Sequence, residues 1–324
     1  MVSTVEGSSL VSLALIEDAV SRLRDVIRLT PLVDASDTLQ TSLFLKCENL
    51  QLGGAFKIRG AFNMIAQLSE EDRKRGVITY SSGNHGRAVA IAARRLGAPA
   101  VIVMPTSAPQ IKVDGVREEG GEVILEGKTS IQRKVRAETE AVDRGLTIVP
   151  PFDHPWIIAG QGTIGLEILE ACPHVSEVLV QIGGGGLIAG VSAAIKQRRP
   201  SVRIIGVEPR GAAKMKTSID CGQPTTLDKT FSIADGLLPI RPGDLTFAHV
   251  QAFVDELITV EDEALARTMS WLFHRTKLVV EPSGAATVAA FQGRTAQRDG
   301  LTVAILSGGN ITLNDMQTLS RLED

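Results

Sequence analysis

Lys57 is the residue whose setting most plainly suggests chemistry. It lies in "GGAFKIRGA" (53–61), between Phe56 and Ile58 and behind two glycines. An apolar frame removes hydration from an ammonium and so favours the neutral amine, which reacts readily with the aldehyde of a cofactor. The alternative is an ordinary lysine at a helix start, whose stem covers apolar surface while its ammonium reaches water.

Three glycine-rich turns offer places for a ligand. They read "SSGNHG" (81–86), "GGGG" (183–186) and "SGGN" (307–310). In open parallel sheets, ligands bind where strands end in such turns. The tetraglycine run stands between a strand and a helix, where free backbone N–H groups and the helix dipole suit a phosphate.

Two other interpretations of the tetraglycine run remain open. It can be a tight turn that only lets a helix pack on a sheet. It can also be part of a dinucleotide fingerprint, with Glu208 as the acid that binds a ribose, since Gly183, Gly185 and Gly190 loosely match that pattern. The apolar frame of Lys57 favours the phosphate interpretation. A phosphate site together with an amine site indicates pyridoxal phosphate.

The elements that must position these residues alternate between strands and helices. Helical segments follow the apolar runs, as in "GRAVAIAARRLG" (86–97). Runs of strand length lie at 76–80, 99–104, 121–127, 146–150, 177–182, 202–209 and 301–310. Strands that are apolar on both faces and joined by helices predict an α/β fold of parallel sheets covered by helices. The irregular connection 222–246 is long enough to carry function or to meet a neighbouring subunit.

Composition excludes several classes of protein. The 324 residues allow two domains, and a net charge of -3 with 4% aromatic residues argues against a nucleic-acid partner. The three cysteines are far apart, which predicts reduced thiols in the cytoplasm and no zinc site. The N-terminus does not resemble a signal peptide, and four glycines inside 178–195 argue against a membrane span.

The four motifs, in this order and at this spacing, resemble the serine/threonine dehydratase family, fold type II of the pyridoxal-phosphate enzymes, to which serine racemase is related. The resemblance runs from "TPL" (30–32) to Asn310 and includes "VVEPSGAA" (279–286). It implies two parallel-sheet domains with helices on both faces and the cofactor in the cleft between them. The large domain would comprise 1–75 and 153–324, and the small mobile domain 76–152.

The resemblance also implies roles for individual residues. Lys57 would hold the cofactor and act as the catalytic base, and Ser82 would act on the opposite face of the substrate. Cofactor-binding roles fall to Phe56, Lys57, Asn84, Gly183, Gly184, Gly185, Gly186, Leu187 and Ser307. Substrate-binding roles fall to Ser81, Ser82, Gly83, Asn84 and His85. The plainer alternatives are helix caps for Ser81 and Asn84, a structural His85, and a turn serine at 307.

Several positions depart from the family pattern. Ala55 stands where serine is common, and Arg87 replaces a small residue and could favour an acidic substrate. Racemase-like members bind a divalent cation through a glutamate, a backbone carbonyl and an aspartate. Glu208 and Ala212 match the first two, but the third position is Lys214. We therefore expect no metal: Lys214 replaces the ion, or it points into solvent, or the site is filled with water and holds neither cation.

The expected activity is elimination of water from a β-hydroxy amino acid, most simply L-threonine or L-serine, to give a 2-oxo acid and ammonia. A serine at the cofactor's ring nitrogen favours elimination over transamination. Alternatives are serine racemization and dehydration of 3-hydroxyaspartate, phenylserine or a hydroxyectoine-derived amino acid; outside the class stand a nicotinamide-dependent dehydrogenase and a binding protein without cofactor. We expect a cytoplasmic homodimer in amino-acid catabolism, with no membrane partner and no C-terminal regulatory domain.

Overall fold

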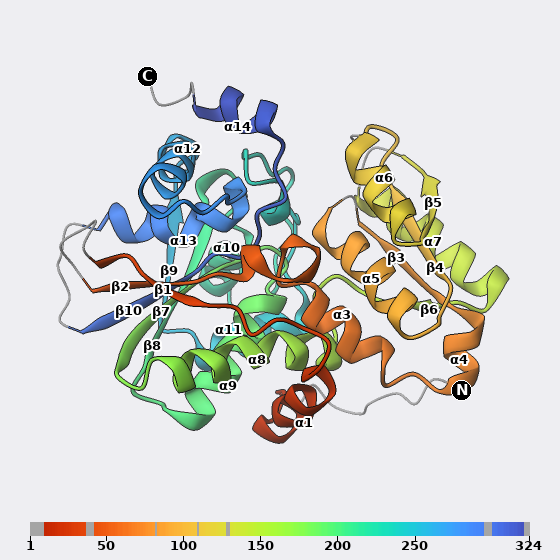
Figure 1. Ribbon diagram of the computed structural model, residues 1–324, viewed down its shortest axis with the longest axis horizontal. Coiled ribbons are helices and arrows are strands. Elements are labelled where there is room, and N and C mark those ends of the chain that lie inside the picture. Colours follow the sequence, from red (N-terminus) through yellow and green to blue (C-terminus); the bar gives the residue numbers. More distant parts are fainter. Residues whose placement is uncertain are drawn as a thin grey trace.

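The chain folds around two sheets, surrounded by helices (Figure 1). The computed structural model describes residues 10–36, 42–81, 83–108, 110–127, 130–294 and 300–320. In the described residues, no helix is long and apolar enough to cross a membrane.

The larger sheet has six strands in the order β1-β2-β10-β7-β8-β9. Their bounds are β1 (Leu32–Asp34), β2 (Leu43–Lys46), β7 (Val175–Gln181), β8 (Arg203–Pro209), β9 (Glu256–Val260) and β10 (Leu301–Ile305). The sequence predicted β7, β8 and β10 but not the other three. All pairs are parallel except β1 with β2, which departs from the all-parallel expectation. The connection between β1 and β2 is too short for the crossover that a parallel pair requires.

Helices cover both faces of this sheet. Val178 and Val180 of β7 face α8 (Pro155–Ala171), α9 (Gly186–Arg198) and α11 (Asp244–Phe253). Leu179, between them, packs instead with α12 (Asp262–Trp271) and α13 (Pro282–Gln292). Successive strand side chains point to opposite faces, so a strand buried on both sides must be apolar throughout, as "VLV" is.

The smaller sheet has four parallel strands in the order β5-β4-β3-β6. They are β3 (Val77–Tyr80), β4 (Ala100–Met104), β5 (Glu122–Leu125) and β6 (Thr147–Ile148), all predicted from the sequence. Ile102 packs with α5 (Asn84–Arg95) and α6 (Gln110–Glu118). Val101 and Val103 pack on the other face against α7 (Ser130–Arg144).

Helix α3 (Ile58–Ile65) connects the two sheets by packing against α8 on one side and α5 on the other. This places Lys57, the residue before α3, where the two parts of the chain meet. The remaining helices are α1 (Leu13–Leu23), α4 (Glu70–Arg75), α10 (Lys214–Cys221), α14 (Leu313–Ser320), η1 (Glu48–Leu50), η2 (Leu52–Gly54), η3 (Arg210–Ala212), η4 (Asp235–Leu237) and the π-helical turn η5 (Leu272–Thr276).

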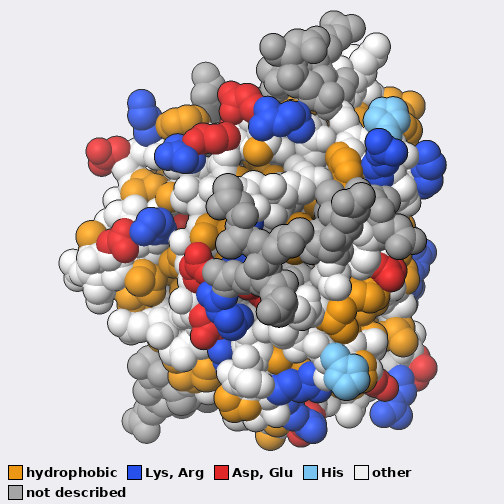
Figure 2. Space-filling model, turned by 90° about the vertical axis from the view of Figure 1, so that its left-hand side faces the viewer, with side chains coloured by type: hydrophobic (Ala, Val, Ile, Leu, Met, Phe, Trp, Pro, Cys, Tyr) orange, Lys and Arg blue, Asp and Glu red, His pale blue; other side chains and the backbone are white. Residues whose placement is uncertain are grey.

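Charged side chains are mixed on the molecular surface. Figure 2 shows acidic and basic side chains interspersed over the described part of one face, with apolar groups scattered among them. This distribution and the net charge of -3 provide no extended positive surface on that face for a polyanion.

Candidate active site

The amine of Lys57 lies inside the protein, without an acidic partner among the described residues. Its Nζ donates a hydrogen bond to the carbonyl oxygen of Pro151 at 2.8 Å and lies 5.1 Å from the centre of the Phe56 ring. Burial lowers the pKa of Lys57 to about 8. About a tenth of the amine is therefore neutral at pH 7, compared with well under a thousandth for an exposed lysine.

The backbone around Lys57 is fixed by the last glycine-rich turn. Ala55 forms a β-bridge with Gly308, and the N–H of Phe56 donates to the carbonyl oxygen of Ser307 at 3.0 Å. Ser307 is buried just beyond the end of β10. The first and last motifs of the sequence, some 250 residues apart, are thus joined directly, which places the Ser307 backbone next to the lysine.

The tetraglycine loop lies against the segment that holds the Lys57 amine. Phe152 follows Pro151 and packs on this loop, where a Cβ on Gly184 would collide with its ring. Gly185 has a φ of 102° and caps α9, whose first N–H groups have no partner within the helix. An amine and a set of free N–H donors are therefore close neighbours, which is what an aldehyde carrying a phosphate requires.

The close packing of the loop also supports part of the packing-turn interpretation. A Cβ on Gly183 would lie 2.8 Å from the carbonyl oxygen of Gly236, and one on Gly185 would lie 2.7 Å from Thr246 Oγ1. The glycines are needed for these contacts whether or not a phosphate binds. Packing and anion binding are not exclusive here, because the loop's N–H groups are separate from its Cα surface.

The dinucleotide interpretation of Glu208 does not agree with the structure. The Glu208 side chain is buried, and its two carboxylate oxygens accept hydrogen bonds from the N–H groups of Met215 and Lys216, each at 2.9 Å. Lys214 Nζ lies 3.0 Å from Glu208 Oε1. A carboxylate already engaged in this way is not available to a ribose, so the structure does not support this alternative at Glu208.

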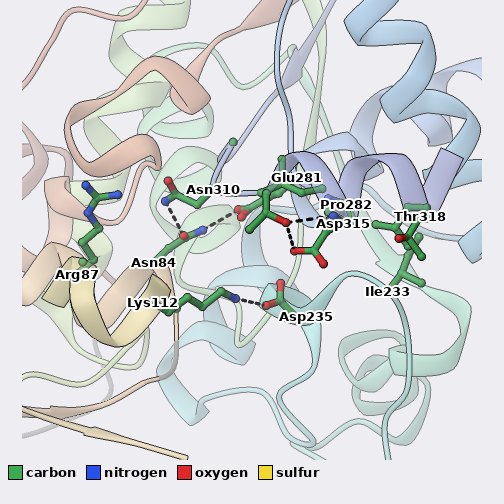
Figure 3. Close-up of a pocket in the computed structure, with 16 residues that line it drawn as sticks. Asn84, Arg87, Lys112, Ile233, Asp235, Glu281, Pro282, Asn310, Asp315 and Thr318 are labelled. Atoms are coloured by element: carbon green, nitrogen blue, oxygen red, sulfur yellow. Dashed lines mark hydrogen bonds and ion pairs between the residues drawn. The ribbon is translucent and has the colours of Figure 1, made fainter. Parts of the chain in front are cut away.

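Asn84, Glu281 and Asn310 form a hydrogen-bonded chain that joins the two parts of the molecule (Figure 3). Asn84 Nδ2 donates to Glu281 Oε1 at 2.6 Å, and Asn84 Oδ1 accepts from Asn310 Nδ2 at 2.8 Å. Asn310 also donates to the carbonyl oxygen of Gly53. The chain connects the start of α5 with the start of α13 and with the turn after β10.

Glu281 combines deep burial with a raised pKa. Its side chain is 5% exposed, and burial together with the charge of Asp235 raises the pKa of Glu281 to about 8. The carboxyl group is therefore protonated at neutral pH and can donate as well as accept a hydrogen bond.

Replacing Glu281 by glutamine should make the protein progressively more stable than the parent as pH rises. A folded-state pKa near 8 lies above the unfolded value of about 4.3, so the parent's unfolding free energy falls between these two pH values. Glutamine removes this titration. We expect the difference in unfolding free energy between Glu281→Gln and the parent to grow by roughly 2–4 kcal/mol from pH 5 to pH 8.5.

Urea unfolding at the two pH values measures this difference, and Glu263→Gln, at an exposed position, is the control. If the unfolding free energies of Glu281→Gln and the parent differ by the same amount at pH 5 and at pH 8.5, Glu281 is ionised in the folded protein.

The "SSGNHG" motif forms the turn from β3 into α5. Ser81 Oγ accepts from the Gly83 N–H at 3.4 Å, a turn contact, while Ser82 lies outside the described residues. A Cβ on Gly83 would meet no atom within 4 Å, so there is open space beside this backbone. The first N–H groups of α5 have no partner within the helix and are available to an anion.

The side chain of His85 is held inside the protein. Its ring is buried, and Nε2 lies 3.0 Å from the carbonyl oxygen of Val149, which can only accept, so Nε2 carries the proton. Burial and the nearby Lys57 charge lower the pKa of His85 to about 3. The neutral ring leaves Nδ1 without a hydrogen, and among the described residues this nitrogen has no hydrogen-bond partner. It cannot donate a hydrogen bond to a carboxylate, so in this position only the backbone N–H of His85 can do so.

A cleft of about 490 Å³ opens beside Asn84. Its walls come from both parts of the chain and include Gly83, Asn84, Arg87 and Lys112 on one side and Asp235 and Glu281 on the other (Figure 3). Lys112 Nζ and Asp235 Oδ2 form an ion pair across it at 2.8 Å. Asp235 and Ile233 belong to the connection 222–246, which therefore contributes to the cleft.

Sequence reasoning assigned no role to Glu281, Asn310 or Pro151. Glu281 follows the apolar residues Val279 and Val280 and precedes Pro282 at the start of a helix, so its position at an element boundary was a usable signal. Pro151 acts through a backbone carbonyl, which no side-chain pattern reveals. In the described residues, no group of three or more His, Cys, Asp and Glu side chains is placed to hold a metal ion.

Comparison with known proteins gives concordant matches. A family model described as pyridoxal-phosphate dependent enzyme matches residues 23–308. The L-threonine ammonia-lyase of Geobacter sulfurreducens is 44% identical over 310 residues, which cover 94% of this chain and 76% of the relative. The L-threonine dehydratase catabolic TdcB of Staphylococcus aureus is 40% identical over 96% of this chain and 92% of its own. The structure of maize serine racemase superposes with a TM-score of 0.91 at 38% identity, covering 96% of this chain and 97% of that one.

Proposed function

This chain belongs to the family of pyridoxal-phosphate dependent enzymes, and from this premise we propose that it is an L-threonine ammonia-lyase. It would remove water from L-threonine and release ammonia and a 2-oxo acid, with L-serine as a second substrate. The observation that carries the proposal is the position of the Lys57 amine, which is held by Pro151 beside the tetraglycine loop. The names of relatives at 40–44% identity support the choice of substrate.

The residues of the site fit the cofactor. Lys57 supplies an amine with a pKa of about 8 to anchor it, and the loop 183–186 with Leu187 supplies N–H groups for its phosphate. Phe56 would pack against the ring, Ser307 would face the ring nitrogen and Asn84 the phenolic oxygen. Asn84 is already held in place by Glu281 and Asn310. When bound, the cofactor supplies a carbonyl that links to amines and a conjugated ring that disperses negative charge.

Lys57 would also act as the base. A side-chain amine with a pKa near neutral can take the Cα proton of the substrate at Nζ and later return a proton. Pro151 fixes the direction of this amine through a single hydrogen bond, which leaves the other positions on nitrogen free. Ser82 would act from the opposite face of the substrate, as the family resemblance implies.

The substrate carboxylate would bind at the start of α5. The N–H groups of Asn84 and His85 and the positive end of the helix dipole suit an anion there, and Gly83 leaves room for its approach. Ser81 would complete this binding site. The neutral ring of His85 adds no positive charge beside Lys57, so the lowered pKa of the Lys57 amine comes from its burial.

We also propose that residues 76–152 form a small mobile domain that closes over the substrate, with 1–75 and 153–324 as the large domain. Support comes from the contacts across the cleft, which are few and polar: Lys112 with Asp235, and Asn84 with Glu281 and Asn310. The Lys112–Asp235 pair can open and close at small cost, because both side chains are partly exposed and such ion pairs contribute little stability.

The biological setting belongs to the same proposal: an enzyme of amino-acid catabolism that works in the cytoplasm as a homodimer. The free cysteines Cys47, Cys172 and Cys221 are compatible with a reducing compartment. Light scattering on the purified holoenzyme tests the dimer, and a monomer mass would reject it.

A substrate panel tests the activity. The purified holoenzyme is given L-threonine, L-serine, 3-hydroxyaspartate and phenylserine, and both ammonia and 2-oxo acid are measured. We expect the highest kcat/KM with L-threonine. Preference for 3-hydroxyaspartate would mean that Arg87 in the cleft binds the side-chain carboxylate of an acidic substrate. Conversion of L-serine to D-serine without release of ammonia would mean that the enzyme is a racemase.

A further inference from the structure

Lys214 is a buried charged residue for which the proposed reaction has no use. Its side chain is fully buried at the start of α10, so the solvent-exposed alternative from the sequence does not hold. Burying an ammonium is costly unless hydrogen bonds and an opposite charge compensate. Its surroundings must therefore supply that compensation.

Four oxygen atoms, from β8, η3, η4 and the residue after β7, surround Lys214 Nζ. The carbonyl oxygens of Ile182, Ala212 and Leu237 lie at 2.8, 3.1 and 3.1 Å, and Glu208 Oε1 lies at 3.0 Å. An ammonium has three N–H donors, and a neutral amine would point its lone pair at one of these oxygens. Burial lowers the pKa of Lys214 and the Glu208 carboxylate opposes this, so the arrangement of the oxygens is what identifies a cation.

These oxygens hold the phosphate loop in place. Ile182 is the residue immediately before Gly183, and Leu237 ends η4. Gly236 of η4 in turn contacts the loop, since its carbonyl oxygen would lie 2.8 Å from a Cβ on Gly183. A single cation therefore joins the start of the tetraglycine loop to η4, which carries Asp235 into the cleft.

We propose that the Lys214 ammonium is a tethered cation in a cation-binding site, built from three carbonyl oxygens and one carboxylate, that fixes the tetraglycine loop. The distances of 2.8–3.1 Å exceed the roughly 2.0–2.6 Å at which magnesium and calcium bind oxygen. They suit an ion of ammonium size, such as ammonium or potassium, which carbonyl oxygens also bind in place of water. Removing the Lys214 side chain should leave a vacant site that binds ammonium or potassium.

The test is cation rescue of Lys214→Ala in the apo protein, without substrate or turnover, so its result is independent of the proposed activity. At constant ionic strength set with tetramethylammonium chloride, the apo Tm of Lys214→Ala should lie roughly 5–10 °C below the parent. Ammonium or potassium should restore it with a saturable dependence on concentration. The dissociation constant for pyridoxal phosphate should rise about tenfold and recover in parallel.

Two further variants separate charge from packing. Lys214→Met keeps much of the side-chain volume but no charge, so we expect the same loss of Tm without rescue, because the side chain fills the ion's place. Lys216→Ala, on the same helix but exposed and paired with Asp220, should match the parent. The parent should show no response to potassium, ammonium, magnesium or a chelator.

Three results would overturn the proposal. They are a Lys214→Met variant as stable as the parent, a Lys214→Ala loss that ammonium and potassium do not reverse, and a parent whose apo Tm a chelator lowers and magnesium restores. If Lys214→Ala fails to fold, the refolding yield replaces the Tm. A yield restored by ammonium supports the site, and a yield equal to that in tetramethylammonium rejects it.

Discussion

Replacing Lys57 by alanine should reduce ammonia release from L-threonine by more than about 10³-fold, within the range lost with an essential general base. Lys57 provides the amine of the site, and no other lysine is hydrogen-bonded to Pro151 in the described structure. The protein should still fold, because the side chain of Lys57 makes one hydrogen bond and no ion pair in the described structure. Rates and circular dichroism of the reconstituted variant measure both effects.

The control for this experiment is Lys74→Ala, at an exposed position on α4, which should behave as the parent. Borohydride reduction of the parent holoenzyme followed by peptide mass mapping should place the cofactor label on the peptide containing Lys57. Added methylamine should partly restore turnover to Lys57→Ala by acting as a free base. Ammonia release by Lys57→Ala at the parent's rate would reject the assignment of this residue.

The second large effect concerns the phosphate. Apo protein should bind pyridoxal phosphate at least about 10²-fold more tightly than pyridoxal, since two or three hydrogen bonds to a charged group at about 1.5–3 kcal/mol each give that ratio or more. Substituting a loop glycine would not isolate this effect, because a Cβ on Gly185 would clash with Thr246 even without ligand. Comparing two ligands leaves the protein unchanged.

Calorimetric titration of the apo protein with pyridoxine phosphate and with pyridoxine removes the aldehyde and isolates the phosphate contribution. The same ratio is expected for this pair as for the aldehydes. If pyridoxal binds within about tenfold of pyridoxal phosphate, the tetraglycine loop is a packing turn and the phosphate binds elsewhere.

The family, the fold class and the cofactor were predictable from the sequence, and the comparisons confirm them. The prediction succeeded because Lys57 in its apolar frame and the glycine turns each have a local chemical meaning. The long apolar strands β7 and β8 are equally local signals. In contrast, β1 and β9 are 3 and 5 residues long and only partly buried, so their hydrophobic pattern does not distinguish them from loops.

The structure was needed wherever an effect depends on distant partners. The direction of the His85 ring depends on Val149, and the pKa of Glu281 depends on burial and Asp235. The environment of Lys214 is assembled from residues between 182 and 237. Neighbouring sequence letters contain no information about such contacts. The assigned roles of Ser82 and of the other site residues stay predictions until the variants are measured.

The position of β10 has a consequence for how the protein is made. Among the strands that the structure describes, β10 comes last in the sequence, yet it lies between β2 and β7 in the middle of the larger sheet. While the chain emerges from the ribosome, β2 and β7 have no strand to separate them, and Ser307 is not yet there to position Phe56. The smaller sheet, whose strands all lie between Val77 and Ile148, can form much earlier. At about 5–20 residues per second, roughly 8–30 seconds of synthesis separate the two events. The nascent chain therefore has no complete place for the cofactor until β10 and Ser307 have been translated.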